Sequence, residues 1–147
     1  MLTFEGFDHI DCRVRSLEAV ESFYDALMPQ LGLPNKRRSY VDDAGDWHEI
    51  SGEHRYNAVE FYEPQRPGST PFFIGFIERK EHNPGLTRIA FRVGRDRLFD
   101  LEALLRQMGA CNIERSEDFN AYPAIFFEDP SGTKLEIVSR AATIMTR

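Results

Sequence analysis

Apolar and polar residues alternate in two stretches of the chain, and these two stretches also resemble each other. The first is His9-Ile-Asp-Cys-Arg-Val14 and the second is Arg88-Ile-Ala-Phe-Arg-Val93. Every second residue is apolar or nearly so, and a period of two is typical of a β-strand with one buried face. The pattern therefore predicts strands over residues 7–14 and 88–93.

A helical spacing of apolar residues follows each of these strands. The first helix is expected to begin after Ser16, a suitable N-cap, and to stop at Gly32, with Pro29 kinking it or ending it early. The second helix is expected over residues 96–107 and closes at Gly109. The apolar stripes consist of Leu17, Val20, Tyr24, Leu27 and Leu31 in the first helix and Leu98, Leu101, Leu105 and Met108 in the second.

Further strands complete each half of the chain. They are expected at residues 38–41, 47–50, 57–62 and 71–77 in the first half, and at 112–115, 124–128 and 133–138 in the second. The segments Ala58-Val-Glu-Phe-Tyr-Glu-Pro64 and Ala124-Ile-Phe-Phe-Glu-Asp-Pro130 also match. Because strand, helix and hairpin all recur, we interpret the chain as a duplicated βαβββ module. The two modules, at about residues 4–80 and 84–140, are expected to form a single domain.

Composition narrows the range of partners. The chain has 147 residues, and 18 Lys and Arg against 24 Asp and Glu give a net charge of −6. This balance disfavours nucleic acid and an anionic membrane surface as partners. No apolar run is long enough to span a bilayer, and residues 1–6 lack the features of a signal peptide, so a cytoplasmic protein is expected. Cys12 and Cys111 fit no metal or redox spacing and are expected to be buried, reduced thiols.

Four motifs, in a fixed order, connect the chain to a known group of proteins. They are Phe7-Asp-His9, Phe23-Tyr24, Pro84-Gly-Leu-Thr-Arg-Ile-Ala-Phe91 and Phe127-Glu-Asp-Pro-Ser-Gly-Thr-Lys-Leu-Glu136-Ile137. With them the chain resembles the glyoxalase, bleomycin-resistance and extradiol-dioxygenase superfamily, also called vicinal oxygen chelate proteins. The resemblance implies an α+β fold in which two tandem βαβββ modules form a curled mixed sheet with a central cup, with the helices outside.

The resemblance also implies a metal site, which this sequence matches only in part. In metal-dependent members the ligand positions correspond here to His9, a residue near 73–75, Arg88 and Glu136. Phe73 and Gly75 offer no donor atom, and an arginine is a permanent cation without a lone pair. Two ligands are fewer than a catalytic metal site usually has. We therefore expect no cofactor, and the alternative is a divalent metal (Zn, Ni, Mn or Fe) bound by His9 and Glu136.

Strand parity predicts which side chains line the cup. If the apolar residues of the first strand of each module pack under the helices, the opposite faces must point inward. Those faces carry His9, Asp11 and Arg13, then Arg88, Ala90 and Arg92, and in the last strand Lys134, Glu136 and Val138. So many ionisable groups are costly to bury unless they are paired, bound to an ion or open to water. The sequence thus predicts a polar cavity that a ligand can enter.

The inward-facing residues suggest two roles for this cavity. Arg88, with Arg13 and Arg92, could bind an anionic ligand such as a carboxylate or phosphate, leaving His9 as a hydrogen-bond donor or general base. In the other interpretation, Arg88 and Glu136 only neutralise each other. Tyr122 is expected to contact the ligand, and an aromatic wall is expected from Trp47, Tyr56, Phe73 and Tyr122.

Two functions follow from these residues. The preferred one is a glyoxalase- or bleomycin-resistance-like protein that binds a small, anionic organic ligand with His9, Arg88 and Glu136 and without a full metal site. It would be a binder or an enzyme that uses His9 and Glu136 as catalytic residues. The alternative is a metal-dependent lyase, isomerase or dioxygenase of the same superfamily. The resemblance also implies that a homodimer is an open alternative, and His48, His54 and His82 are expected to be surface or structural residues.

Overall fold

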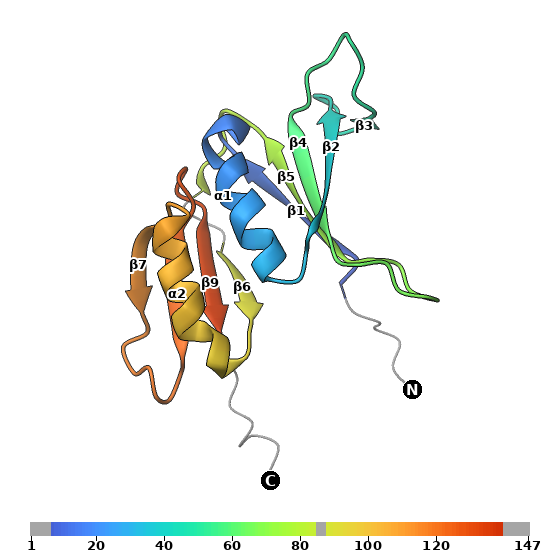
Figure 1. Cartoon of the computed structure of the whole chain (residues 1–147). Coiled ribbons are helices and arrows are strands. Elements are labelled where there is room, and N and C mark those ends of the chain that lie inside the picture. The colour runs from blue at the N-terminus through green and yellow to red at the C-terminus, as the bar shows by residue number, and fades with distance from the viewer. Residues whose placement is uncertain (1–6, 85–87, 140–147) are drawn as a thin grey trace. The chain divides into compact units, whose positions relative to one another are not determined.

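The computed structural model describes residues 7–84 and 88–139. Within these residues two helices and nine strands follow one another, and Figure 1 shows their arrangement within each part. The first half contains β1 (His9–Val14), α1 (Leu17–Gln30), β2 (Asn35–Val41), β3 (Trp47–His48), β4 (Ala58–Tyr62) and β5 (Phe73–Glu78). The second half contains β6 (Arg88–Arg92), a 3-10 turn (Arg95–Arg97), α2 (Leu98–Gln107), β7 (Cys111–Arg115), β8 (Ala124–Glu128) and β9 (Lys134–Val138).

The chain divides into two compact units that do not coincide with the two sequence modules. The first unit comprises the described residues 7–17 and 28–82, and the second comprises 18–27, 83–84 and 88–139. Most of α1 therefore belongs to the second unit. There the Tyr24 hydroxyl donates a hydrogen bond of 2.9 Å to Asp129 Oδ2, and both residues are fully buried. The predicted single-domain organisation stays a prediction.

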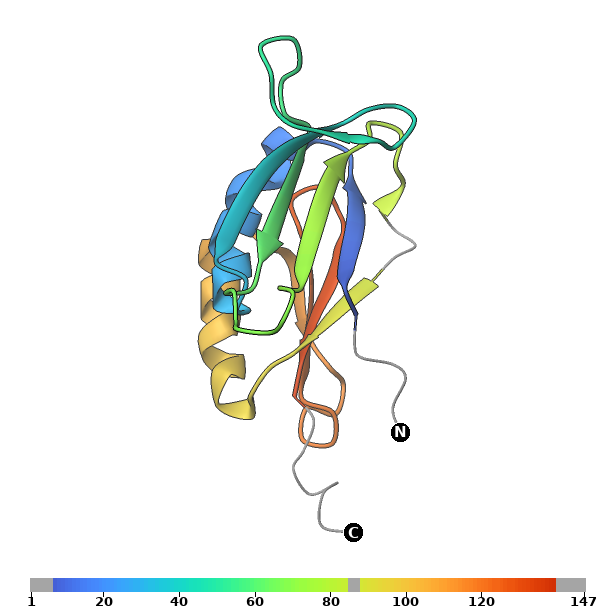
Figure 2. The same ribbon diagram turned by 90° about the vertical axis from the view of Figure 1, so that its right-hand side faces the viewer.

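Each unit has its own mixed β-sheet. The strand order is β1-β5-β4-β2-β3 in the first sheet, which Figure 2 shows from one face, and β6-β9-β8-β7 in the second. In both sheets the first strand of the module pairs in parallel with the last, and the remaining pairs are antiparallel. Residue His9 is the partner of Phe73, and Arg88 is the partner of Lys134. The shared topology confirms the duplicated βαβββ-like module and the α+β fold class.

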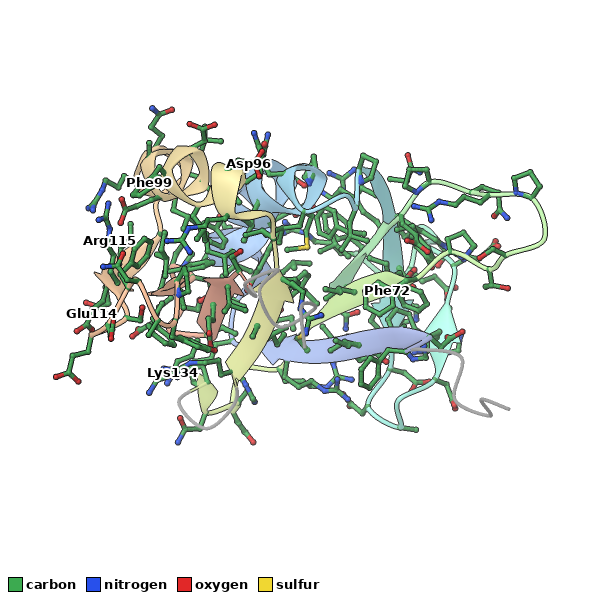
Figure 3. All side chains as sticks on the ribbon, turned by 90° about the horizontal axis from the view of Figure 1, so that it is seen from below. Phe72, Asp96, Phe99, Glu114, Arg115 and Lys134 are labelled. Carbon is green, nitrogen blue, oxygen red and sulfur yellow. The ribbon has the colours of Figure 1, made fainter. Side chains whose placement is uncertain are left out.

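The expected alternation of faces is present in both sheets. In β1, Cys12 and Val14 are buried while His9, Asp11 and Arg13 are exposed. In the second unit, Figure 3 shows Lys134 on the side of the sheet opposite to α2, the helix that carries the labelled Phe99. Because Glu136 shares the parity of Lys134, it also belongs to the face opposite to α2. Each sheet thus has one polar face.

Side chains at the edge of the second sheet connect α2 to β7. Arg115 on β7 donates two hydrogen bonds, of 2.8 and 2.7 Å, to the carboxylate of Glu102 on α2. Its guanidinium also lies 5.1 Å from the ring centre of Phe99 and 5.0 Å from that of Phe119. Figure 3 shows Phe99 and Arg115 at this edge. The bidentate pair and the two aromatic contacts fix α2 across the sheet.

The element bounds differ from the prediction mainly in β2. This strand begins at Asn35, three residues before the predicted start, because Lys36 and Arg37 pair with Phe61 and Glu60 of β4. Charged side chains do not give the apolar pattern of a strand, but backbone pairing with β4 stabilises the strand here. Helix α1 ends at Gln30, one residue after Pro29, and Gly32 then adopts a φ of +88° that suits a glycine. The expected stop at Gly32 is confirmed, and Pro29 lies inside the last turn of the helix.

The expectation that both cysteines are buried is wrong for one of them. Cys12 is buried in β1, but Cys111 is exposed at the start of β7. Strand β7 lies at the edge of the second sheet, and four of its five residues are exposed. An apolar residue at a sheet edge need not be covered, which the sequence pattern did not indicate.

Two further expectations concern a membrane-spanning helix and the segments at residues 1–6 and 85–87. No helix among residues 7–84 and 88–139 is long and apolar enough to cross a bilayer. The expected absence of a signal peptide concerns residues 1–6, and residues 85–87 belong to the motif that opens the second module. Both segments lie outside the described residues.

Candidate functional site

His9 opens strand β1 and lies among carboxylates. Its ring stacks on Phe73 with the ring centres 4.6 Å apart, and its Nδ1 lies 2.7 Å from Asp8 Oδ2. Its Nε2 lies 3.6 Å from Asp11 Oδ2. The hydrogen bond with Asp8 raises the pKa of His9 most, and the charges of Asp11 and Glu60 raise it further, while partial burial opposes them. These carboxylates therefore stabilise the protonated ring relative to the neutral one.

Glu60 is a buried carboxylate that the sequence analysis did not single out. It lies in the middle of β4 with 5% of its surface exposed. Ser39 Oγ donates to its Oε1 at 3.0 Å, and the Tyr62 hydroxyl donates to its Oε2 at 2.7 Å. Burial, followed by this bond to Glu60, raises the pKa of Tyr62 to about 12, so the phenol stays a donor at neutral pH. A single acidic residue within the apolar strand Ala58–Tyr62 was the available signal.

A cavity of about 300 Å³ opens on the polar face of the first sheet. This volume is at the lower end of the range that small-molecule sites occupy. All of its lining residues belong to the first unit. They are His9, Asp11, Arg37, Ser39, Trp47, His48, Glu49, Glu60 and Phe73.

Three side chains of this cavity converge over Gly75 in β5. A Cβ atom at Gly75 would lie 2.8 Å from Asp11 Oδ1, 3.7 Å from Glu60 Cγ and 3.8 Å from the Trp47 ring. The first of these distances is too short for any real side chain. The glycine thus leaves room for the Asp11 carboxylate beside Glu60 and Trp47.

The polar face of the second sheet is built around Glu136. This residue lies in β9 with 5% of its surface exposed, and its Oε1 accepts a 2.7 Å hydrogen bond from the Tyr122 hydroxyl. Its Cα partners are Ala90 in β6 and Phe126 in β8. The guanidinium of Arg88 lies over the Phe126 ring, 4.9 Å from its centre.

The structure brings together some of the predicted site residues. Tyr122 and Glu136 are in contact, and Arg88 and Arg92 lie exposed on the same face of β6. Within the described part of the chain, Arg88 and Glu136 form no ion pair. His9 and Arg13 belong to the first unit, whereas the other four predicted residues belong to the second. The roles of all six stay predictions.

The predicted aromatic wall is present only in part. Trp47 and Phe73 line the cavity of the first unit, whereas Tyr56 stacks against the guanidinium of Arg38 at 4.9 Å. Tyr122 lies in the second unit. The four aromatic residues therefore do not line one described cavity.

The donor atoms do not fit the metal that the resemblance implies. No group of three or more His, Cys, Asp or Glu side chains within residues 7–84 and 88–139 is arranged to hold a metal ion. At the equivalent ligand positions, Gly75 has no side chain and Arg88 contributes a positive charge. We therefore derive no chemical step from a bound metal.

Sequence comparison alone identifies no relatives, but the fold has clear structural ones. No family model matches the chain, and no curated protein matches it. A glyoxalase/bleomycin resistance protein from Albidiferax ferrireducens aligns over 92% of this chain and 98% of its own, with 19% identity and a TM-score of 0.59. A putative glyoxalase from Bacillus halodurans aligns over 92% and 96%, with 21% identity and a TM-score of 0.63.

A third similar structure was solved with a bound metal ion and a small organic ligand. It is a variant of the fosfomycin resistance protein FosX from Listeria monocytogenes, in complex with Mn(II) and 1S,2S-dihydroxypropylphosphonic acid. It aligns over 99% of this chain and 100% of its own, with 14% identity and a TM-score of 0.61. The chain has the vicinal oxygen chelate fold. The predicted resemblance to this superfamily is thus confirmed at the level of the fold, and a shared fold of this kind serves many chemistries.

Proposed function

We propose that this protein of the vicinal oxygen chelate fold binds a small, anionic organic molecule without a full metal site. Arg88 and Arg92 would bind the anionic group, and Tyr122 and Glu136 would bind polar groups beside it. His9 and Arg13, from the first unit, are the further binding residues that we propose. The observation that carries the proposal is the pair of exposed guanidinium groups on the polar face of β6.

The arginines of β6 have the features of an anion-binding pair. They are four residues apart on one strand, an even spacing, so both side chains leave the same face. Lys134 is the Cα partner of Arg88 and adds a third positive charge to this face. Among the described residues, neither arginine has an ion-pair partner. A guanidinium that lacks a carboxylate partner can offer its planar fork of N–H donors to a ligand carboxylate, phosphate or phosphonate.

His9 and Glu136 would act on the bound molecule in different ways. Because the pKa of His9 is raised, its ring favours the protonated form and would donate a hydrogen bond. Glu136 is held in one position by Tyr122 and would accept a hydrogen bond or a proton from the ligand. The phosphonate in the similar FosX structure is an example of a small organic anion bound by a protein of this fold.

Calorimetric titration tests this function directly. Protein treated with a chelator would be titrated with 1S,2S-dihydroxypropylphosphonic acid and with small alkyl phosphonates and carboxylates. We expect saturable binding to at least one of these anions without added metal, and about a tenfold loss of affinity in Arg88→Ala, since a bidentate charge-assisted contact is removed. Arg106→Ala, at an exposed position on α2, is the matched control and should bind as wild type does.

Two results would contradict the proposal. One is a failure of every anion in the panel to bind. The other is binding that occurs only after addition of Zn, Ni, Mn or Fe, which would favour the metal-dependent enzyme instead.

A further inference from the structure

We infer that the cavity of the first unit binds a compact organic cation, an ammonium group with its alkyl substituents. This inference goes beyond the proposed function, which rests on the arginines of β6 in the second unit. It depends on the buried carboxylate of Glu60, the carboxylate of Asp11 above Gly75, and the exposed ring of Trp47.

Glu60 provides a negative charge that is fixed in position. Both of its oxygens accept hydrogen bonds, from Ser39 Oγ and from the Tyr62 hydroxyl, and both donors are neutral groups. These bonds orient the carboxylate without cancelling its charge. Each oxygen keeps a lone pair that can accept a further bond. A buried carboxylate held in this way attracts a cation strongly, because little water screens it.

Asp11 brings a second carboxylate to the same place. Its Oδ1 lies 2.8 Å from the point where a side chain at Gly75 would begin, and Glu60 Cγ lies 3.7 Å from that point. Both carboxylates line the same cavity, so a positive charge placed there would be attracted by both. The glycine at position 75 is what permits their approach.

Trp47 supplies the surface against which an alkylammonium group would pack. Its ring lies 3.8 Å from the same point above Gly75, yet 41% of its surface is exposed. Indole is the ring that binds cations best through its face. An exposed tryptophan beside two carboxylates therefore favours an organic cation over a bare metal ion. The finding that the described residues contain no suitable metal-binding group agrees with this.

Negatively charged side chains outnumber arginines in the lining of the cavity. Three carboxylates, of Asp11, Glu49 and Glu60, face one arginine, Arg37. Arg37 lies close enough to Tyr62 to lower the pKa of its hydroxyl, so part of its charge acts on that group.

The two histidines of the lining also carry positive charge when protonated. His48 Nε2 lies 2.8 Å from Asp42, outside the lining, whereas His9 lies 2.7 Å from Asp8 through Nδ1 and 3.6 Å from the lining residue Asp11 through Nε2. Because Asp42 balances His48, the three lining carboxylates still outnumber the charges of Arg37 and His9. The cavity itself can accept at least one further cation.

Tryptophan fluorescence of the full chain gives a direct test, because Trp47 is the single tryptophan of the sequence. The probe would be choline, and the control probe would be 3,3-dimethyl-1-butanol, which has the same shape without the charge. We expect a saturable change in emission with choline and none with the neutral alcohol at the same concentrations. The same response to both probes, or no response to choline, would overturn the inference.

Substitutions connect the response to the two carboxylates. Glu60→Gln keeps the shape of the side chain and removes its charge, and we expect choline to bind about tenfold more weakly. Glu53→Gln, which removes the same charge from a residue of the first unit outside this lining, should change affinity by less than about twofold. Equal affinities of wild type and Glu60→Gln would contradict the inference.

A second variant keeps the test valid if Glu60→Gln does not fold. Gly75→Ala places a methyl group against Asp11 Oδ1, a side-chain end that can move aside. We expect a folded protein by circular dichroism that has lost choline binding by about tenfold or more, because the methyl group occupies the ligand's place. Unchanged binding in this variant would overturn the inference. The phosphonate titration with Arg88→Ala is independent of these results, so the two proposals can fail separately.

Discussion

At the scale of single residues, the environment of His9 explains why a motif of metal-binding proteins need not bind metal here. A histidine that ligates a metal must be neutral at the ligating nitrogen. The carboxylates of Asp8 and Asp11, at 2.7 and 3.6 Å, instead favour the protonated ring. Arg88, the equivalent position in the second module, carries a permanent positive charge. Both members of the repeated pair therefore favour positive charge over metal coordination.

The raised pKa of His9 can be tested by removing its largest cause. In Asp8→Asn the hydrogen bond to an ionised carboxylate is lost, so the pKa of His9 should fall toward its ordinary value of 6.5. Two-dimensional NMR of the ring protons against pH measures this directly. Asp43→Asn, an exposed change of the same charge in the same unit, should leave the His9 titration where it is.

The same pKa shift predicts how stability depends on pH. Because the folded-state pKa of His9 is raised, its pairing with Asp8 stabilises the fold fully below pH 6.5. That contribution is lost as the pH rises through the raised folded-state pKa. Asp8→Asn should therefore lower the thermal midpoint at pH 5.5 more than at pH 8.5, and equal losses at both would contradict the assignment.

Residue-scale reasoning from sequence found some members of the first cavity and missed others. Strand parity placed His9 and Asp11 on the polar face, and Trp47 and Phe73 were expected near a ligand. Glu60 did not stand out, because in the sequence it is one residue of the segment 58–64 that matches 124–130. Its hydrogen-bond partners Ser39 and Tyr62 lie 21 and 2 residues away in sequence. Contacts across strands depend on register, which a single sequence specifies poorly.

At the scale of elements, α1 is the element whose position the periodicity could not predict. Four members of its predicted apolar stripe are buried, namely Leu17, Val20, Tyr24 and Leu27, whereas Leu31 lies beyond the end of the helix and is partly exposed. The stripe does not reveal which sheet covers it. Residues 18–27 belong to the unit of the second sheet, where Tyr24 reaches the turn between β8 and β9. By contrast, the strand pairing was predictable, because the two modules repeat the same order.

The bond between α1 and this turn should contribute measurably to stability. Asp129 also accepts hydrogen bonds from the backbone N–H groups of Ser131 and Thr133, so its carboxylate organises the turn. Tyr24→Phe removes one donor from this fully buried carboxylate and should cost roughly 1.5–3 kcal/mol in the free energy of unfolding. Urea denaturation measures the loss. Tyr40→Phe, which keeps the ring that stacks on His54, is the control and should change stability by less than about 0.5 kcal/mol.

At the scale of the whole molecule, duplication has produced two sheets of the same topology with different polar faces. In the first sheet the face carries Asp11 and Glu60, and in the second it carries Arg88 and Arg92. The sequence analysis predicted the shared topology from the repeated pattern. It could not predict that Asp11 and Glu60 lie close to Gly75. Their positions depend on the absence of a side chain at residue 75, which no hydrophobic pattern indicates.

The metal content of the purified protein depends on the ligands that the polar faces of both sheets provide. Protein purified without chelator should contain less than about 0.1 Zn, Ni, Mn or Fe per chain, since no group of three suitable ligands comes together among residues 7–84 and 88–139. Elemental analysis measures this. One metal ion per chain that survives dialysis would contradict the expectation and would support His9 and Glu136 as ligands. Arg88→His is the informative companion, because it adds a third imidazole or carboxylate donor to that pair.

The assignment of α1 to the second unit has a consequence for any attempt to divide the chain. The polypeptide passes between the two units at residues 17–18, 27–28 and 82–83, so no single cut separates them. A fragment ending at residue 82 would keep Tyr24 and Leu27 but lose the strands of the unit that contains them. Such a fragment would expose an apolar helix face and should associate with itself or with the missing half. Expressed together, the two fragments are expected to reassemble, because the second fragment lacks α1 and the α1 of the first fragment lacks the unit to which it belongs.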